Sequence, residues 1–367
     1  MTRWGHGVVI GKFLPPHAGH LHLIERARAR VERLTAIVCQ RPEDPIPGAR
    51  RLAWLQELAP GVETVLVDDR WDPSDSALWA RLTLGWLGAR PDVAFTSEDY
   101  GEAWARAMGC AHVLVDRERT AVPVSGSAVR ADPLAAWEHL PPPVRAWYAL
   151  RVVVLGAEST GTTTLARALA ERLCTRWVPE YGREYSAEKY GRGDRRWRGE
   201  ELVAIAREQA RREDAAAREA DRVLVCDTDP FATLQWHRRY VGGPPPAELV
   251  ALARERRPHL YLLTGDELPF AQDGLRDGEH VRRDMHQWFL EALREQSVPW
   301  RLVTGPHARR LDAALGEVER LARGSSWRPG ARPCCRRDRS WSGWTSALSC
   351  CRAASRTSAP HCRARWP

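Results

Sequence analysis

Two copies of one local pattern constrain the fold of this chain more than any other feature. A short apolar run at residues 7–10 leads into a glycine-containing turn and a helical segment, and the run at 151–155 does the same. Apolar runs this short, bounded by turn residues, are typical of strands buried in a parallel sheet. Strand and helix patterns alternate after both copies, so the sequence predicts an α/β fold made of two domains.

The hydrophobic periodicity predicts the remaining elements. In the first half, strands are expected at 34–40, 63–67, 93–96 and 111–115, and helices at 20–34, 50–58, 78–87 and 101–108. In the second half, strands are expected at 223–226, 260–263 and 300–303, and helices at 163–173, 200–220 and 311–323. A proline cluster at 141–143 separates the two patterns. We therefore expect domains at 1–145 and 150–323, followed by a tail at 324–367.

The positive charge of the chain lies in that tail. Nine of the 55 basic residues and one of the 47 acidic residues fall in 324–367, which leaves 46 of each in the rest of the chain. The net charge of +8 is therefore no sign of a nucleic-acid-binding domain, and we expect no nucleic-acid partner. The tail lacks aliphatic periodicity, so we expect it to be disordered or to be a translated out-of-frame extension.

Cysteine use and hydropathy indicate the compartment. Five of the nine cysteines lie in the tail, where the adjacent pairs at 334–335 and 350–351 leave a zinc site open, although they lack the usual spacing. The other four are scattered, so we expect no disulfide framework and a reduced, cytoplasmic protein. No apolar run reaches the ~18–20 residues that cross a bilayer, and no signal peptide precedes the first strand, so no membrane partner is expected.

The first glycine turn carries two histidines three residues apart. It reads GKFLPPHAGH from Gly11 to His20. Glycine lets the backbone approach a ligand closely, and His20 falls at the start of a helix, where unpaired N–H groups and the helix dipole favour an anion such as a phosphate. Lys12, His17 and His20 are suitable donors to phosphate oxygens. The alternative is that the histidines only cap the helix or lie at the surface.

This turn resembles the (H/T)xGH signature of the adenylyltransferase superfamily, whose fold is a Rossmann-like α/β unit. Residues 124–130 (VSGSAVR) resemble a second motif of that superfamily, ISGTxVR. With the segments 96–98 and 137–145, the chain is similar to nicotinamide mononucleotide adenylyltransferases of the NadR type. The resemblance implies direct attack of the mononucleotide phosphate on the α-phosphorus of ATP, with Mg²⁺ neutralising the triphosphate and pyrophosphate as the leaving group.

The resemblance also implies roles for particular residues. Lys12, His17, His20 and Arg130 would stabilise the transferring phosphoryl group. Arg50 or Arg51 would contact the mononucleotide phosphate, although a solvated helix start is an equal alternative. The ATP phosphates would be bound by Gly11, Phe13, Gly19, Ser125, Gly126 and Ser127. Trp71, Trp79 and Trp86 lie where a ring could stack on nicotinamide, whereas a core or surface role is commoner for any single tryptophan.

The second glycine turn is a P-loop pattern without its lysine. Residues 156–164 read GAESTGTTT, in which Thr162 occupies the lysine position of GxxxxGK[ST] and Thr163 the Mg²⁺-binding hydroxyl position. Backbone N–H groups can still cradle phosphates, but the ammonium that neutralises β- and γ-phosphate charge is missing. Phosphate contacts are expected from the turn and from one later arginine: Gly156, Glu158, Ser159, Thr160, Gly161, Thr162, Thr163, Thr164 and Arg276.

Other segments of the second half resemble nicotinamide riboside kinase domains of the NadR type. Residues 180–185 (EYGREY) resemble an EYAREY segment, and 272–276 (QDGLR) resemble a DDGLR lid whose arginine could cover the phosphates in place of the lysine. An apolar strand runs into Asp227 and Asp229, so either carboxylate could hold Mg²⁺ or act as a base. The resemblance implies Mg²⁺ binding by Thr163 and Asp227, and substrate contacts from Glu180, Arg183 and Asp273.

Three functions are compatible with these patterns. The leading hypothesis is a bifunctional NAD salvage enzyme that phosphorylates nicotinamide riboside and adenylylates the resulting mononucleotide, with ATP as co-substrate. The main alternative is an adenylyltransferase whose degenerate P-loop domain binds nucleotide as a sensor. A DNA-binding regulator is disfavoured, because residues 1–323 carry no net charge and no helix-turn-helix segment is expected before the first strand. A homo-oligomer is compatible with all three.

Overall fold

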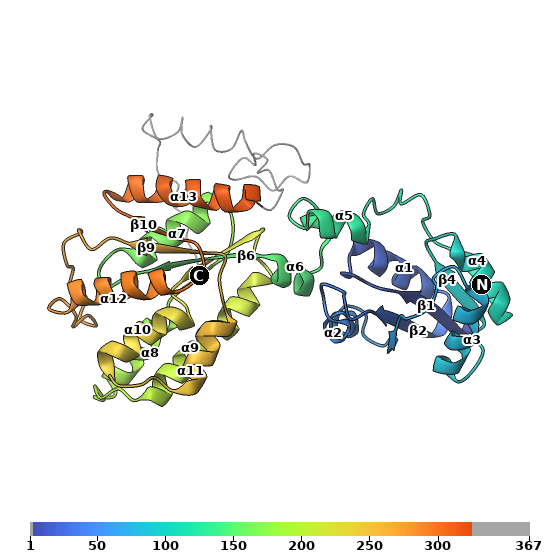
Figure 1. Ribbon diagram of the computed structural model, residues 1–367, viewed down its shortest axis with the longest axis horizontal. Helices are drawn as coiled ribbons and strands as arrows, with labels where there is room; N and C mark the ends of the chain where they lie inside the picture. The colour runs from blue at the N-terminus through green and yellow to red at the C-terminus, as the bar shows by residue number, and fades with distance from the viewer. Residues whose placement is uncertain (1–2, 325–367) are drawn as a thin grey trace. The chain divides into compact units, whose positions relative to one another are not determined.

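The computed structural model describes residues 3–324, which form two compact units. The first unit ends at Tyr148 and the second begins at Ala149. Each contains a five-stranded parallel sheet with helices on both faces (Figure 1), so the predicted α/β fold is confirmed. Within residues 3–324, no helix is both long and apolar enough to cross a membrane. The expectations about the tail beyond Gly324 fall outside this range.

The first unit has the sheet order β3-β2-β1-β4-β5, with β1 in the centre. Its strands are β1 (Trp4–Gly11), β2 (Val31–Gln40), β3 (Glu63–Asp68), β4 (Val93–Thr96) and β5 (Ala111–Leu114). Its helices are α1 (Ala18–Arg28), α2 (Gly48–Leu58), α3 (Ser76–Leu87), α4 (Tyr100–Met108), α5 (Gly126–Ala131) and α6 (Pro142–Tyr148), with a 3₁₀ turn at Trp137–His139. The chain reverses its direction across the sheet between β1 and β4, and open α/β sheets bind ligands at such a switch point.

The second unit repeats this plan with the order β10-β9-β6-β8-β7. Its strands are β6 (Leu150–Leu155), β7 (Trp177–Val178), β8 (Val223–Asp227), β9 (Leu260–Thr264) and β10 (Trp300–Val303). Its helices are α7 (Thr162–Arg172), α8 (Tyr181–Gly191), α9 (Gly199–Ala217), α10 (Pro230–Tyr240), α11 (Ala247–Glu255), α12 (Arg282–Glu295) and α13 (His307–Gly324). In Figure 1, α7 and α13 cover one face of this sheet, and α9, α10 and α11 lie on the other.

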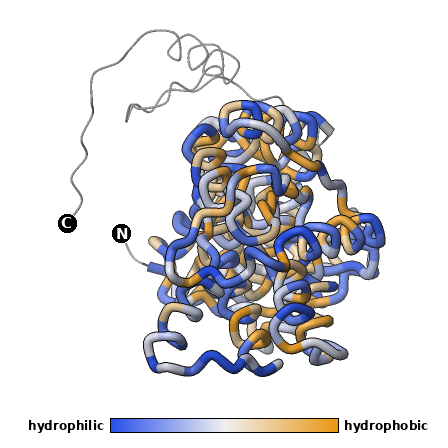
Figure 2. The backbone as a smooth tube through the Cα atoms, turned by 90° about the vertical axis from the view of Figure 1, so that its left-hand side faces the viewer, coloured by the Kyte–Doolittle hydropathy of each residue, from blue (hydrophilic) through white to orange (hydrophobic). Residues whose placement is uncertain are grey.

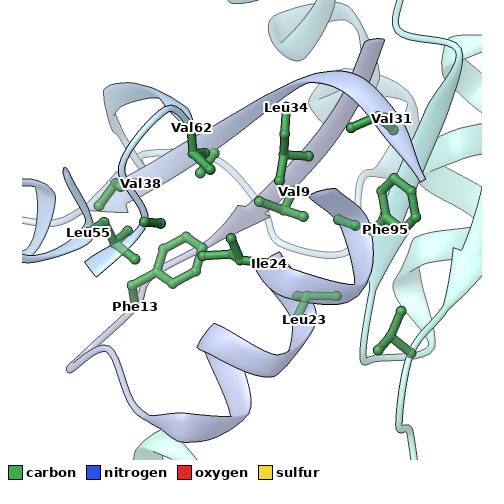
Figure 3. Packing of buried hydrophobic residues seen from close by; sticks show 14 of the residues in the cluster. Val9, Phe13, Leu23, Ile24, Val31, Leu34, Val38, Leu55, Val62 and Phe95 are labelled. Carbon is green, nitrogen blue, oxygen red and sulfur yellow. The ribbon is translucent and has the colours of Figure 1, made fainter. Parts of the chain in front are cut away.

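The cores lie on both faces of each sheet. Successive residues of a strand point to opposite faces, so Val8 and Val9 of β1 enter different clusters. Val9 packs with Leu23 and Ile24 of α1 (Figure 3), and Val8 belongs to the cluster that contains Trp104 of α4. Figure 2 shows that hydrophobic and hydrophilic segments alternate along the backbone. Packing on both faces fixes the end of β1, where the first glycine turn begins.

The helix expected at 20–34 is wrong in its second half. The helix α1 ends at Arg28, and Val31 and Leu34 belong to β2. Both side chains are buried in the same cluster, so their spacing of three fitted a helical period although the backbone is extended. Apolar residues three positions apart therefore do not distinguish a helix from a strand that is buried on both faces. The proline cluster begins α6, which is the last helix of the first unit.

Candidate active sites

The first unit contains a cavity of about 680 Å³ at the carboxyl ends of β1 and β4. It is enclosed by the first glycine turn, by the segment after β4 and by the start of α5. Residues expected at a nucleotide site contribute to its wall: Gly11, Lys12, Phe13, His20, Ser125, Gly126, Ser127 and Arg130. The structure therefore brings together the two motifs, which lie more than 100 residues apart in the sequence.

The two histidines stack on each other at the beginning of α1. His17 occupies the N-cap position, and the centroids of the His17 and His20 rings are 3.7 Å apart. Burial lowers the pKa of His17 to about 4 and holds the pKa of His20 well below its ordinary value, with the His17 ring as a further cause for His20. Both are therefore neutral at pH 7 and each has one N–H to donate. A Cβ at Gly19 would lie 3.1 Å from the His17 ring, so a larger residue would disturb this pair.

Only one of these histidines reaches the large cavity. His20 lines it, whereas His17 is 4% exposed and lies behind, beside a smaller hollow of about 80 Å³. The Nδ1 atoms of both rings are buried without a hydrogen-bond partner. His20 is thus the histidine that can contact a bound phosphate directly, and His17 supports its ring.

Arg130 connects the two motifs. Its Nη1 donates a hydrogen bond to the carbonyl oxygen of Leu14 at 2.7 Å, which joins α5 to the first glycine turn. Ser125 caps α5 by accepting a hydrogen bond from the Ala128 N–H at 3.1 Å. A Cβ at Gly126 would approach the Leu14 carbonyl to 3.2 Å, so the close contact favours glycine there. Arg130 therefore braces the cavity and also presents its charge to it.

Two charged residues of the cavity were missed by the sequence reasoning. Asp69 is buried after β3, where its carboxylate accepts from Arg41 Nε at 2.8 Å and lies 3.8 Å from Lys12 Nζ. Arg119 lines the cavity and lies 3.5 Å from the Glu98 carboxylate. The acidic pair that ends β3 at the carboxyl edge of the sheet was a usable signal for Asp69. Nothing in the local pattern around Arg119 pointed to it.

The structure does not support the expected phosphate contact from Arg51. Its guanidinium is fully buried and donates to the carbonyl oxygens of Ile46 and Cys39 at 3.0 and 2.8 Å, and to that of Lys12. It also donates to Asp44 at 2.6 Å. Since these donors are occupied inside the fold, Arg51 braces the turn and does not face the ligand. Its neighbour Arg50 is exposed and also lies outside the cavity wall.

The three tryptophans considered for stacking form one cluster. Trp71, Trp79 and Trp86 have ring centroids between 5.8 and 6.1 Å apart. Trp79 alone of these lines the large cavity, while the other two line a groove beside the edge strand β3. Trp79 is thus the one tryptophan of the cluster that could contact a bound ring.

The second unit has a smaller cavity, of about 100 Å³, around its P-loop. Ser159 and Gly161 adopt positive φ values of 60° and 85°, which turn the loop from β6 into α7. A Cβ at Gly156 would approach Thr264 Oγ1 to 2.3 Å, so this position has no room for a side chain. The wall includes Gly156, Glu158, Ser159, Thr162, Thr163, Glu180, Arg183, Asp227 and Arg276.

Three P-loop residues are not part of the wall. Thr160 is buried and its hydroxyl binds the Ala157 carbonyl and Thr264 Oγ1, each at 2.7 Å. Arg310 donates to the Thr160 carbonyl at 2.5 Å from behind the loop. Thr164 is exposed and follows Thr163, the last residue of the loop that lines the cavity. Gly161 contributes only its backbone turn. The loop is therefore held in shape by residues that do not face the ligand.

Thr163 and Asp227 lie together where a Walker-type metal site would be. Thr163 Oγ1 donates to Asp227 Oδ2 at 2.6 Å. Burial raises the pKa of Asp227 to about 6, although hydrogen bonds from Thr163 and Thr162 act in the opposite direction. Thr162, at the lysine position, therefore binds a carboxylate and brings no positive charge to the loop.

The structure separates the two aspartates that follow the β8 strand pattern. Asp229 caps α10 by accepting from the Ala232 N–H at 2.9 Å, and it also accepts from the Tyr261 hydroxyl at 2.9 Å. It is 1% exposed and does not line the cavity, so the expected catalytic role is not supported by its position. Asp227 keeps its place at the site.

A segment between β9 and α12 folds over the P-loop. The Ala271 N–H donates to Ser159 Oγ, and the Gly278 N–H donates to a Glu158 carboxylate oxygen, both at 2.8 Å. Asp273 in this segment forms an ion pair with Arg183 and lies 3.4 Å from Arg276 Nε. The two arginines of the cavity therefore share one acid of the covering segment.

An aromatic wall on the other side of the cavity was not predicted. The rings of Trp197 and Tyr240 stack at 5.2 Å, and those of Trp236 and Tyr240 at 6.0 Å. Gln209 lines the same side; its Oε1 accepts from the Tyr181 N–H at 3.0 Å, while its buried Nε2 has no partner. The aromatic residues at 181–197 and 236–240 were a signal in the sequence, but they come from α8, from α10 and from the segment between α8 and α9.

Known proteins share the fold of both units. Residues 8–132 match a family model described as cytidylyltransferase-like, and residues 151–310 match one described as an AAA domain. A crystal structure of a NadR protein in complex with NAD and AMP-PNP has the same fold, with a TM-score of 0.68 and 18% identity over 88% of this chain and 97% of that one. A NadR structure in complex with NR has a TM-score of 0.71 at the same identity and coverage.

Two curated proteins are also similar to this chain in sequence. The trifunctional NAD biosynthesis/regulator protein NadR of Escherichia coli (strain K12) is 30% identical over 320 residues, covering 80% of this chain and 77% of the relative. The NadR protein of Salmonella typhimurium (strain LT2) is 30% identical over 316 residues with the same coverage. Together with the two nucleotide-type cavities, this similarity shows that the chain belongs to the NadR family of NAD biosynthesis proteins.

Proposed function

We propose that the first unit transfers the adenylyl group of ATP to nicotinamide mononucleotide, which gives NAD and pyrophosphate. A phosphate oxygen of the mononucleotide would attack the α-phosphorus, and the bond from that phosphorus to the oxygen leading to the β-phosphate would break. The observation that carries this proposal is the meeting of His20, Lys12 and Arg130 with the start of α5 in one cavity of about 680 Å³. Donors fixed before the substrate binds stabilise the charge of such a transition state without further reorganisation.

The second unit would supply the mononucleotide by phosphorylating nicotinamide riboside. The P-loop, the Thr163–Asp227 pair and the aromatic wall support this proposal, because they offer places for phosphates, a metal ion and a flat ring. The hydroxyl and carboxylate oxygens, 2.6 Å apart, are hard ligands of the kind that hold Mg²⁺ together with substrate phosphates.

A second candidate function rests on Thr162. A P-loop unit without the lysine could bind nucleotide as a sensor while the first unit alone catalyses a reaction. Purified protein given nicotinamide riboside and Mg-ATP separates the two, with mononucleotide and NAD measured by chromatography. Formation of both products supports the bifunctional enzyme. NAD formed only when mononucleotide is supplied supports the sensor, and no NAD in either case contradicts the proposed adenylyl transfer.

Because both proposed reactions use ATP, we propose that the protein acts in the cytoplasm, and neither reaction needs a nucleic-acid partner. Salt-dependent binding of duplex DNA by a chain ending at Arg323 would contradict that expectation.

A further inference from the structure

Three carboxylates line the cavity of the second unit, and two of them are already held. Glu158 lies 2.8 Å from Arg239 Nη1 and accepts from the Gly278 N–H at 2.8 Å. Asp227 accepts from Thr163 and belongs to the proposed metal site. The third, Glu180, forms no hydrogen bond to any of residues 3–324. It is therefore the one carboxylate of this wall that is available to a substrate.

The fold places Glu180 beside the phosphate site. It follows β7 and occupies the N-cap position of α8 without capping the helix through its side chain. β7 pairs with β8 in the register Val178 to Cys226, so Glu180 lies at the same carboxyl edge of the sheet as Asp227. A residue at a helix start on a parallel sheet has a fixed backbone, which suits a group that must meet a reacting atom.

The aromatic wall defines where an acceptor would lie. A nucleoside whose ring packs against Trp197, Tyr240 and Trp236 can accept a hydrogen bond from Gln209 Nε2, which is buried and has no partner among residues 3–324. Its ribose would then extend toward the P-loop, and Glu180 lines the same cavity. Because Asp229 caps α10 and lies outside the wall, it is not available for this reaction.

We propose that Glu180 is the general base of the second unit, which accepts the proton of the nucleoside 5′-hydroxyl. This inference rests on the kinase function proposed above. As the proton moves to a Glu180 carboxylate oxygen, the hydroxyl oxygen forms a bond to the γ-phosphorus of ATP. The bond between the γ-phosphorus and the oxygen bridging to the β-phosphate breaks, and ADP leaves with that electron pair. The proton then passes from Glu180 to water.

The surrounding charges agree with a proton acceptor. Burial, followed by the Asp227 carboxylate, raises the pKa of Glu180, with Glu158 as a smaller contribution in the same direction, whereas Arg183 and Arg276 lower it. A base with a pKa closer to neutrality removes a proton more effectively than an ordinary carboxylate. The carboxylate form of Glu180 is the active one. The rate of phosphorylation should therefore rise as the pH increases through the pKa of Glu180, and it should be low at pH values below that pKa.

The test compares Glu180→Gln with the unaltered chain in mononucleotide formation from nicotinamide riboside and Mg-ATP. The amide has the same shape and cannot accept the proton, so kcat should fall roughly 10²-fold or more, while KM for the nucleoside changes less than about threefold. The pH dependence of the remaining rate should also disappear. Glu184→Gln on the same helix is the matched control; Glu184 is 62% exposed and paired with Arg212, and its substitution should leave the rate within twofold.

Four outcomes would overturn the inference. If Glu180→Gln keeps more than a third of kcat, or if it loses nucleoside binding in calorimetry instead of turnover, Glu180 is not the base. If Glu180→Asp, which withdraws the carboxylate, is as active as the unaltered chain, its position does not matter. If neither the unaltered chain nor Thr162→Lys makes any mononucleotide, the kinase function itself fails, and this result differs from selective loss in the variant.

Discussion

Each of the two cavities is built on a strand, a glycine turn and a helix, yet the charged residues in their walls differ. In the first unit the turn delivers the neutral His20 ring to a cavity of about 680 Å³, where Lys12, Arg119 and Arg130 outnumber the carboxylates of Asp69 and Glu98. In the second unit three carboxylates and two arginines line a cavity of about 100 Å³. The segment 270–278 lies over the P-loop of this cavity. The first site therefore offers the His20 ring and three side-chain cations to an anionic ligand. In the proposed kinase reaction the second site would also need a metal ion, and its two arginines are paired with Asp273.

The comparison also separates two uses of arginine. Arg51 of the first unit is buried and serves the fold, whereas Arg183 of the second is 44% exposed and pairs with an acid of the covering segment. A buried guanidinium cannot be removed without leaving its acceptors unpaired, while an exposed ion pair contributes little to stability. The following predictions test these differences, from the largest expected effect to the smallest.

Arg51→Met should destabilise the first unit by about 3–5 kcal/mol, because it leaves Asp44 buried without its partner. Calorimetric unfolding of the variant measures this loss, and the transition of the second unit serves as an internal reference. Arg50→Met, at the exposed neighbouring position, should change the stability by less than about 0.5 kcal/mol. Equal effects at the two positions would show that the buried contacts of Arg51 do not matter.

His20→Ala should lower kcat for NAD formation from mononucleotide and ATP by roughly 10²-fold, or about 2.7 kcal/mol, since it removes a donor to the transition state. Steady-state kinetics with excess mononucleotide measure the change. His22→Ala, on the same helix but outside the wall of the large cavity, is the control and should retain most of the activity. Near-normal turnover of His20→Ala would mean that the ring only supports the structure.

Thr162→Lys should make the second unit more like the first by adding a cation to the P-loop. We expect the rate of nucleoside phosphorylation to rise about tenfold, which corresponds to about 1.4 kcal/mol of transition-state stabilisation. Thr164→Lys places the same charge two residues further, at an exposed position outside the cavity wall, and should have no such effect. An unchanged rate for Thr162→Lys would indicate that Arg183 or Arg276 already provides the charge.

The smallest effect is a difference between two pH profiles. Burial lowers the pKa of His17 to about 4 and that of His20 well below its ordinary value, so both rings stay neutral as the pH falls from 8 to about 5.5. Adenylyl transfer should therefore show no loss near pH 6.5, whereas nucleoside phosphorylation should decline as the Glu180 carboxylate takes up a proton. A loss near pH 6.5 in the first reaction would contradict the neutral histidine pair.

Local chemistry was sufficient to predict the two turns and the strands before them. Glycine spacing and short apolar runs are properties of consecutive residues, so they can be found without a fold. The aromatic wall could not be predicted in this way, because Trp197, Trp236 and Tyr240 meet only after α9 and α10 have packed. The helix predicted at 20–34 was too long for a related reason. It ends at Arg28, and the strand that follows is buried on both faces, so its residues show no alternation of apolar and polar side chains.

The sequence by itself determined the α/β class, the order of the two units and the residue types available at each turn. Only the tertiary structure decided which of those side chains face a ligand. Arg51 and Asp229 have the right chemistry and the right position in the sequence, but their hydrogen bonds are directed into the fold. Sequence spacing specifies where a residue lies along an element, whereas its direction depends on the elements that pack around it.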